Sequence, residues 1–86
     1  MKTIHKFTLT QNGSQTIEMP RGAKILHCAP QHGEVQLWAL VNTDEPKVTR
    51  FFWIIGTGQE MPDVPLKYVG TVQITMWVWH IFEEAA

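Results

Sequence analysis

Four histidines and one cysteine are the side chains of this 86-residue sequence that could bind a metal or take part in catalysis. The positions of His5, His27, His32 and His80 do not match zinc-site spacings, and no Cys-x-x-Cys or His-x-His pair is present. His27 and Cys28 are adjacent, and neighbouring residues of a strand point to opposite faces. The sequence therefore predicts no metal site.

Nucleophilic catalysis has only two candidate residues. Cys28 could form a dyad with a histidine, but its neighbours Leu26 and Ala29 indicate a buried thiol. Ser14 is the only serine and follows Asn12-Gly13, where turn chemistry explains it. No Gly-x-Ser-x-Gly or Walker motif occurs. We therefore expect a protein that is not an enzyme and uses no cofactor.

Phosphate binding is the chemistry that a second group of residues favours. Gly56-Thr57-Gly58 follows the most apolar segment, and glycines on both sides of a threonine let backbone N–H groups approach an anion. A flexible turn is the alternative interpretation of this segment. Arg50 precedes it on the same predicted strand, while Arg21 and Lys24 flank a predicted turn. Guanidinium groups bind phosphate with two parallel hydrogen bonds.

Aromatic side chains are more numerous than a small core requires, with four tryptophans in the chain. Trp38 and Trp53 could stack on a base. Trp77 and Trp79 fall on one face of the last predicted strand and could form a subunit or partner interface. Core packing is the alternative for each of these side chains taken alone.

Composition excludes several classes of protein. Charged residues make up 17% of the chain, against roughly 25% in an ordinary soluble domain. The net charge of −1 argues against a partner that is a nucleic-acid polymer. The apolar runs are too short to cross a membrane, and the start of the sequence has no apolar signal-peptide region. A single cysteine fits a reducing compartment.

The elements that must position these residues all have the character of strands. Hydrophobic alternation and β-branched content predict strands at residues 2–10, 15–19, 24–29, 34–42, 48–55, 67–73 and 75–83. Residues 34–42 also suit a short helix, but their surroundings favour a strand. Residues 48–55 are apolar on both faces and predict a central or interface strand. The expected fold is one all-β domain over residues 1–86, a small antiparallel sandwich or barrel of six or seven strands.

Four connections carry specific turn signals. Asn12-Gly13 predicts a β-hairpin between the first two strands, since both residues tolerate positive φ. Residues 19–22 (MPRG) predict a type I turn. Residues 56–66 hold two glycines and two prolines and predict an irregular segment. Gly70-Thr71 predicts a bend, bulge or break.

Several motifs in combination resemble a family of small tailed-phage and prophage proteins. They are Ile4-x-Lys6-Phe7 together with TIEMPRGAKIL (16–26), LWALV (37–41), IGTG (55–58), YVGT (68–71) and HIFE (80–83). The resemblance covers nearly the whole chain and implies a phage origin and expression in the host cytoplasm. It implies no catalytic residues. The Trp77-Val78-Trp79 run is richer in tryptophan than the family pattern.

Two functions follow as expectations. By analogy with phage anti-defence sponges, the chain is predicted to sequester a small nucleotide-like anion in a homo-oligomeric scaffold. Phosphate would be held by Arg21, Lys24, Arg50 and the Gly56-Thr57-Gly58 backbone, and a base by Trp53 or Trp38. The alternative is an interaction module that docks on a host or phage protein through Trp77 and Trp79.

Overall fold

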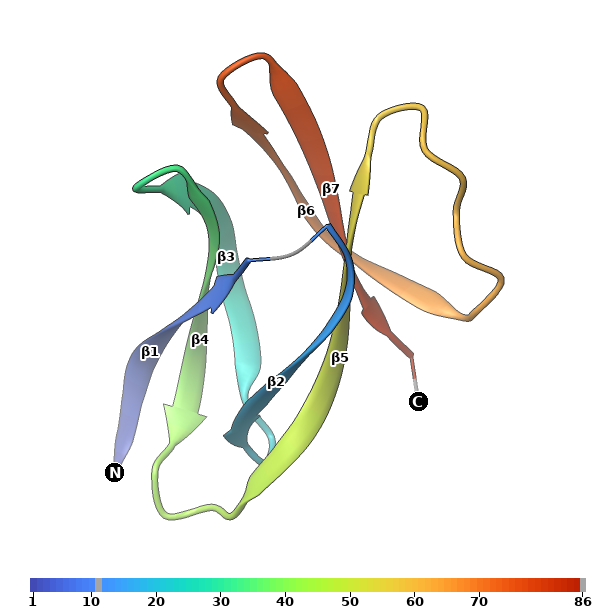
Figure 1. The fold of residues 1–86 in the computed structure, drawn as a ribbon. Helices are drawn as coiled ribbons and strands as arrows, with labels where there is room; N and C mark the ends of the chain where they lie inside the picture. The colour runs from blue at the N-terminus through green and yellow to red at the C-terminus, as the bar shows by residue number, and fades with distance from the viewer. Residues whose placement is uncertain (11, 86) are drawn as a thin grey trace.

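The computed structural model describes residues 1–10 and 12–85, and this part of the chain forms seven antiparallel strands without a helix. The strands are β1 (Lys2–Leu9), β2 (Gly13–Pro20), β3 (Lys24–Gln31), β4 (Glu34–Asn42), β5 (Lys47–Gly56), β6 (Leu66–Ile74) and β7 (Trp77–Glu84). They build one sheet in the order β1-β4-β3 and another in the order β2-β5-β7-β6 (Figure 1). The all-β prediction is confirmed, and the strands end within two residues of the predicted ranges.

Alternation places the core between the two sheets. Every second residue of β4 is buried, as predicted, whereas Trp38 and Leu40 point to the outer face. The opposing sheet supplies Phe52 and Ile54 from β5 and Ile81 from β7. Burying a side chain of this size contributes roughly 1.5–3 kcal/mol. Among the described residues, the core consists of Leu9, Met19, Ala23, Val35, Leu37, Ala39, Val41, Phe52, Ile54, Val72 and Ile81.

The strand that is apolar on both faces is central, as its sequence predicted. β5 pairs with β2 on one side and with β7 on the other. Phe52 and Ile54 face the core, while Phe51, Trp53 and Ile55 lie on the outer face of the sheet. Residues that are three apart on β5 therefore lie on opposite faces, which matters for the site below.

The predicted hairpin at Asn12-Gly13 is wrong. β1 pairs with β4 and β2 pairs with β5, so the connection at Gly13 crosses from one sheet to the other. Gly13 does adopt a positive φ of 93°. Leu9 and Met19, one on each of these strands, are both buried between the sheets. Residue 11 lies outside the described residues.

A type I′ hairpin turn occurs instead between β3 and β4. His32 and Gly33 have φ values of 55° and 76°, and Gln31 pairs with Glu34 across the turn. Two central residues at positive φ define this turn type. The predicted turn at 19–22 is displaced by one residue, because the Ala23 N–H donates to the Pro20 carbonyl and Gly22 takes a positive φ.

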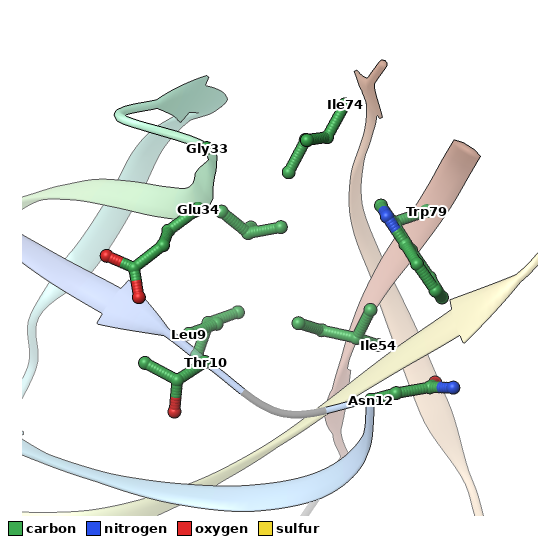
Figure 2. A pocket seen from close by; sticks show the side chains of 9 residues that line it. Leu9, Thr10, Asn12, Gly33, Glu34, Ile54, Ile74 and Trp79 are labelled. Atoms are coloured by element: carbon green, nitrogen blue, oxygen red, sulfur yellow. The ribbon is translucent and has the colours of Figure 1, made fainter. Parts of the chain in front are cut away.

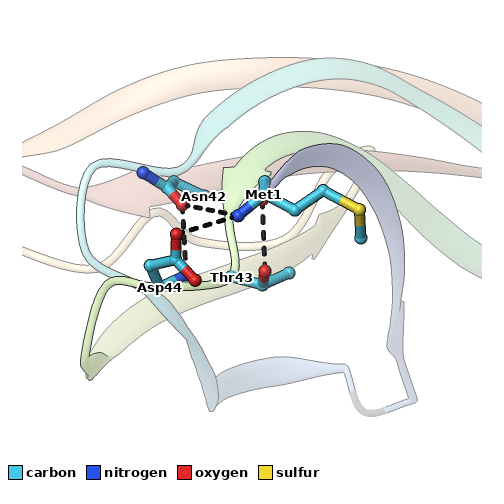
Figure 3. Close-up of polar contacts among 4 residues, drawn as sticks. All are labelled: Met1, Asn42, Thr43 and Asp44. Carbon is cyan, nitrogen blue, oxygen red and sulfur yellow. Dashed lines mark hydrogen bonds and ion pairs between the residues drawn. The ribbon is translucent and has the colours of Figure 1, made fainter.

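One end of the three-stranded sheet is closed by hydrogen bonds to the first residue. The Met1 amino group donates to Asn42 Oδ1 at 3.3 Å and to Asp44 Oδ2 at 3.0 Å (Figure 3). The Thr43 hydroxyl and N–H both donate to the Met1 carbonyl. These bonds fix the start of β1 to the β4–β5 loop.

Candidate functional site

A groove of about 320 Å³ opens where the edge strand β3 of one sheet faces the edge strand β6 of the other. Both strands carry a β-bulge at the groove. Leu26 is the extra residue on β3 and Val69 the extra residue on β6, since the register of each strand shifts around it. Bulges bend a strand and redirect its side chains, and they are frequent at sheet edges beside binding sites.

Two lysines in this groove are available to an anion. Lys24 on β3 and Lys67 on β6 line it from opposite sides. Within residues 1–10 and 12–85, neither ammonium group makes an ion pair. Arginines 21 and 50, by contrast, are both paired with carboxylates of the chain. The groove therefore offers two positive charges that the fold itself does not use.

Arg50 lies in the same groove but is engaged by the protein. Its Nε and Nη2 donate to the Glu83 carboxylate at 2.5 and 2.8 Å, and Nη1 donates to the Ala23 carbonyl at 2.6 Å. The two side chains are only 19% and 16% exposed, so this bidentate pair is largely shielded from water. Arg50 thus links β5, β7 and the start of β3, and stabilises the wall of the groove rather than presenting a free guanidinium.

Aromatic rings extend from the β3 side of the groove. His27 lines the groove and stands opposite Trp38 in the β3–β4 register. The two ring centroids are 5.9 Å apart at an interplanar angle of 38°. Trp38 therefore lies one strand away from the groove and supports the imidazole ring.

A longer row of rings extends from the β6 side. Tyr68 lines the groove and stands opposite Phe82 in the β6–β7 register. Phe82 in turn stands opposite Trp53 in the β5–β7 register. Tyr68 and Phe82 contact edge to face, with centroids 5.7 Å apart. The Trp53 Nε1–H donates to Glu84 Oε1 at 3.0 Å. Because Trp53 and Arg50 lie on opposite faces of β5, one small ligand cannot contact both.

The predicted phosphate residues are only partly brought together. Lys24 and Arg50 share the groove, whereas Arg21 lies outside it and donates to Glu45 Oε1 through Nε and Nη2. Gly56 ends β5 six residues beyond Arg50, which corresponds to about 20 Å along a strand. The Gly56-Thr57-Gly58 segment is therefore remote from the groove.

The Gly56-Thr57-Gly58 segment also has partners of its own. The Gly56 N–H donates to Gln59 Oε1 at 2.7 Å, and the Thr57 N–H donates to the Val78 carbonyl at 3.2 Å. The Thr57 hydroxyl is 2.8 Å from His80 Nε2. Two of the three backbone donors are thus used within the fold, which gives this segment a structural role at the junction of β5 and β7.

Trp77 and Trp79 do share a face of β7, as predicted, with ring centroids 6.4 Å apart. Their environments differ. Trp79 packs against the core, whereas Trp77 is 61% exposed near the tip of the β6–β7 hairpin, beside Met76 at 79%. This hairpin extends beyond the neighbouring strands (Figure 1). Of these two tryptophans, only Trp77 exposes most of its side chain to solvent.

A second, smaller cavity of about 160 Å³ lies beside Trp79 (Figure 2). Leu9, Ile54 and Ile74 give it apolar walls, and Glu34 also lines it. None of the described residues that line it carries a positive charge. It therefore lacks the groups that would attract an anion.

The chemistry of the remaining candidates is limited. Desolvation by burial raises the pKa of the Cys28 thiol from 9.0 to about 11, so the thiol stays protonated at neutral pH. Among the described residues, no cluster of three or more His, Cys, Asp or Glu side chains could hold a metal ion. In the same part of the chain, no helix could span a membrane.

Residues 1–86 match the family DUF7352, a domain of unknown function. The chain belongs to this family. No curated protein and no solved structure matches it.

Sequence reasoning missed Lys67, His27, Tyr68 and Glu83 as residues of one groove. The sequence alone suggests His27 only as a possible metal ligand or partner of Cys28, and it marks Tyr68 only as part of the YVGT motif. Their convergence depends on β3 lying beside β6, and no local pattern in the sequence encodes that strand order. The one local signal is the glycine at position 70, which predicts an irregularity beside the bulge of β6.

Proposed function

We propose that this DUF7352 protein is a non-enzymatic binding protein that sequesters a small anionic, nucleotide-like ligand in the groove between β3 and β6. The observation that carries the proposal is that Lys24 and Lys67, which make no ion pair within the described residues, line one groove together with His27 and Tyr68. Lysine and arginine bind phosphate, and aromatic side chains stack on bases. Binding of this kind requires no acid–base pair.

The roles of the residues follow from their contacts. Lys24 and Lys67 would bind the phosphate, and His27 and Tyr68 would contact the base. Arg50 would hold Glu83 and thereby the shape of the groove. Resemblance to tailed-phage proteins supplies the setting, which is the host cytoplasm, where sequestering a nucleotide signal would counter a host defence.

Native mass spectrometry of the gently purified protein is the first test, because it reports subunit number and any bound small molecule together. Titration calorimetry with nucleotides then compares Lys24→Ala/Lys67→Ala with the matched control Lys2→Ala/Lys47→Ala. Both variants remove two positive charges, but only the first removes them from the groove. We expect the first to weaken binding at least about tenfold and the control to bind almost like the wild type. Equal binding by the two variants would refute the proposal.

An interaction module is the second candidate, and the exposed hairpin tip favours it. Met76 and Trp77 are the two most exposed large apolar side chains after residue 60, and tryptophan is enriched at interface hot spots. Met76→Ser/Trp77→Ala should abolish capture of a host or phage protein partner and leave nucleotide binding unchanged. Trp79 stays intact in this variant because it packs on the core. A partner retained by the variant would exclude this tip as the docking surface.

The proposal includes a homo-oligomer, in which copies of the chain cover each other's exposed apolar side chains. Large apolar side chains are exposed on both outer faces, with Ile4 and Leu40 on one sheet and Phe51 on the other. Ile4 and Leu40 stand opposite each other in the β1–β4 register, and exposed apolar surface is commonly covered by a partner chain. The subunit number from native mass spectrometry decides the point, and a monomer at micromolar concentration would contradict it.

A further inference from the structure

We infer that two copies of this chain associate through the free edge of β2, with the β2 strand of one copy pairing antiparallel with the β2 strand of the other. The inference rests on the homo-oligomer in the proposed function and deepens it by naming the surface and the partner. β2 is an outer strand of its sheet and lies at the opposite edge from β6. The association would therefore leave the groove between β3 and β6 open to a ligand.

Alternate residues of β2 direct their backbone N–H and C=O groups away from β5. The Arg21 N–H donates to the Pro46 carbonyl one position beyond the β2–β5 register, so these two residues form a hydrogen-bonded pair. Hydrogen-bonded and non-hydrogen-bonded pairs alternate along an antiparallel ladder. The odd-numbered residues of β2 therefore bond to β5. The backbone groups of Ser14, Thr16 and Glu18 point to the free edge.

Two further observations agree with this assignment. Pro20 stands at one of the edge-facing positions, where its missing N–H leaves no bond to β5 unmade. On the other side of β5, the Thr57 N–H donates to the Val78 carbonyl, so the odd-numbered residues of β5 bond to β7. The even-numbered residues of β5 therefore bond to β2, and they stand opposite the odd-numbered residues of β2.

β2 is the edge strand with the least protection against pairing with another chain. Natural proteins blunt their edge strands with β-bulges or with charged side chains, lysine above all. β3 and β6 each carry a bulge, and β1 carries Lys2 and Lys6. β2 keeps a regular register from Gly13 to Pro20, and residues 13–20 include no lysine or arginine. A regular edge of this kind is a template for a further strand.

A groove of about 530 Å³ lies along this edge. Residues 14–17 of β2 line it, together with Thr8 and Thr10 at the end of β1. Phe51, which is 48% exposed, also lines it, and none of the described lining residues carries a charge. Residues 14–17 (SQTI) are themselves uncharged. The same segment of a second copy can therefore enter the groove without leaving a charge unpaired, and it would cover part of Phe51.

A two-fold axis at Thr16 gives the pairing that uses every edge-facing residue. Thr16 then stands opposite Thr16 of the second copy, and Ser14 stands opposite Glu18. Directly opposed residues of this type exchange both of their backbone hydrogen bonds. No like charges meet, because Glu18 carries the only charge of the strand and faces a serine. Moving the axis by one residue toward Pro20 would place Pro20, which has no N–H to donate, opposite Ser14.

Sedimentation equilibrium tests the inference by measuring the monomer–dimer dissociation constant of the wild type and of two edge variants. Thr16→Pro removes the N–H at the centre of the pairing and spares the bonds to β5, since proline is tolerated on the free side of an edge strand. Thr16→Lys keeps the N–H but places two ammonium groups opposite each other. We expect a wild-type dimer at micromolar concentration and a dissociation constant at least about tenfold higher in both variants.

Lys6→Pro is the matched control, because Lys6 directs its N–H to the free edge of β1 in the same way. The Thr43 N–H donates to the Met1 carbonyl one position beyond the β1–β4 register, so the odd-numbered residues of β1 bond to β4. Lys6→Pro should dimerise like the wild type. Circular dichroism establishes that each variant is folded.

A cysteine cross-link tests the register directly in a Cys28→Ala background. Thr16→Cys should form a disulfide-linked dimer under mild oxidation, because directly opposed residues have Cα atoms about 5.5 Å apart, within the reach of a disulfide. Thr49→Cys is the control. Thr49 is exposed on the same face of the adjacent strand β5, away from the axis, and its variant should stay unlinked.

The outcomes separate this inference from the proposed function. An unchanged dissociation constant in both Thr16→Pro and Thr16→Lys, or an equal weakening by Lys6→Pro, would overturn the inference and leave the homo-oligomer and the ligand groove standing. A wild type that remains monomeric would overturn the inference together with the homo-oligomer. Nucleotide binding is measured separately by calorimetry, and its absence from the wild type would refute the ligand groove whatever the oligomeric state.

Discussion

Gly70 of β6 lies against Cys28 of β3, so closely that a β-carbon on residue 70 would stand 3.1 Å from the Cys28 Cβ and 3.6 Å from its Sγ. This contact joins the edges of the two sheets directly beside the groove. Val69, the bulged residue that lines the groove, immediately precedes it. The spacing of the sheets at the groove is therefore set by the absence of a side chain at position 70.

Gly70→Ala should destabilise the fold by about 1–2 kcal/mol, because the added methyl group meets a β-carbon fixed to the backbone of β3 and forces the strands apart. Urea denaturation would measure the loss. Cys28→Gly removes the opposing β-carbon, so Gly70→Ala should cost less in that background than in the wild type. An equal cost in both backgrounds would show that this contact does not limit the spacing of the sheets.

Breaking the Arg50–Glu83 pair should destabilise the protein by roughly 2–3 kcal/mol, because Glu83→Gln or Arg50→Ala leaves a shielded charge without its partner. Arg21→Ala is the matched control. This substitution breaks the Arg21–Glu45 pair, in which the arginine side chain is 64% exposed. The loss of so exposed a pair should cost about 1 kcal/mol or less. Chemical denaturation compares the variants, and similar losses at both sites would contradict the structural role of Arg50.

Alternation within a strand was sufficient to predict much of this fold. Val35, Leu37, Ala39 and Val41 share a face in the sequence and are all buried. The two-faced apolar pattern of residues 48–55 identified the central strand. The hairpin predicted at Asn12-Gly13 was wrong because this dipeptide indicates only that the local backbone can adopt a positive φ. Gly13 has such a φ here, in a connection that crosses between the sheets. The strands that it connects pair instead with β4 and β5, which lie far along the chain from the turn.

The site was harder to predict because its residues meet across the seam of the two sheets. Lys24 and Arg50 were identified by charge type, but the carboxylate that engages Arg50 lies 33 residues away along the chain. Lys67 has no local signal that distinguishes it from a solvated surface lysine. Its relevance appears only once β6 is placed beside β3.

Thr75→Gly should stabilise the protein by about 1 kcal/mol. Thr75 adopts a φ of 55° in the β6–β7 turn, a conformation that a β-branched residue tolerates poorly and glycine adopts freely. Its hydroxyl bond to the Ile74 carbonyl is local and offsets little of the strain. His32→Gly is the comparison, because histidine accepts a φ of 55° more readily than threonine and should gain less. Thermal denaturation ranks the two, and a larger gain at position 32 would contradict this account.

Alkaline pH should weaken the fold through Cys28. Burial raises the pKa of its thiol from 9.0 to about 11 in the folded protein. Between pH 9 and 11 the unfolded chain releases this proton while the folded chain retains it, so the free energy of unfolding falls with rising pH. Below pH 9 both states keep the proton, and the thiol adds no pH dependence.

Cys28→Ala isolates this contribution, because all other titrating groups are the same in both proteins. Denaturation midpoints at pH 8.0 and above, up to about pH 10.5, should fall more steeply for the wild type than for the variant. Alkylation by iodoacetamide at pH 8 should also be slow in the folded protein and fast in denaturant, since the thiolate is the reactive form. Parallel pH profiles for the two proteins would show that Cys28 stays solvated in the folded state, and the seam between β3 and β6 would then be more open than Gly70 and Cys28 indicate.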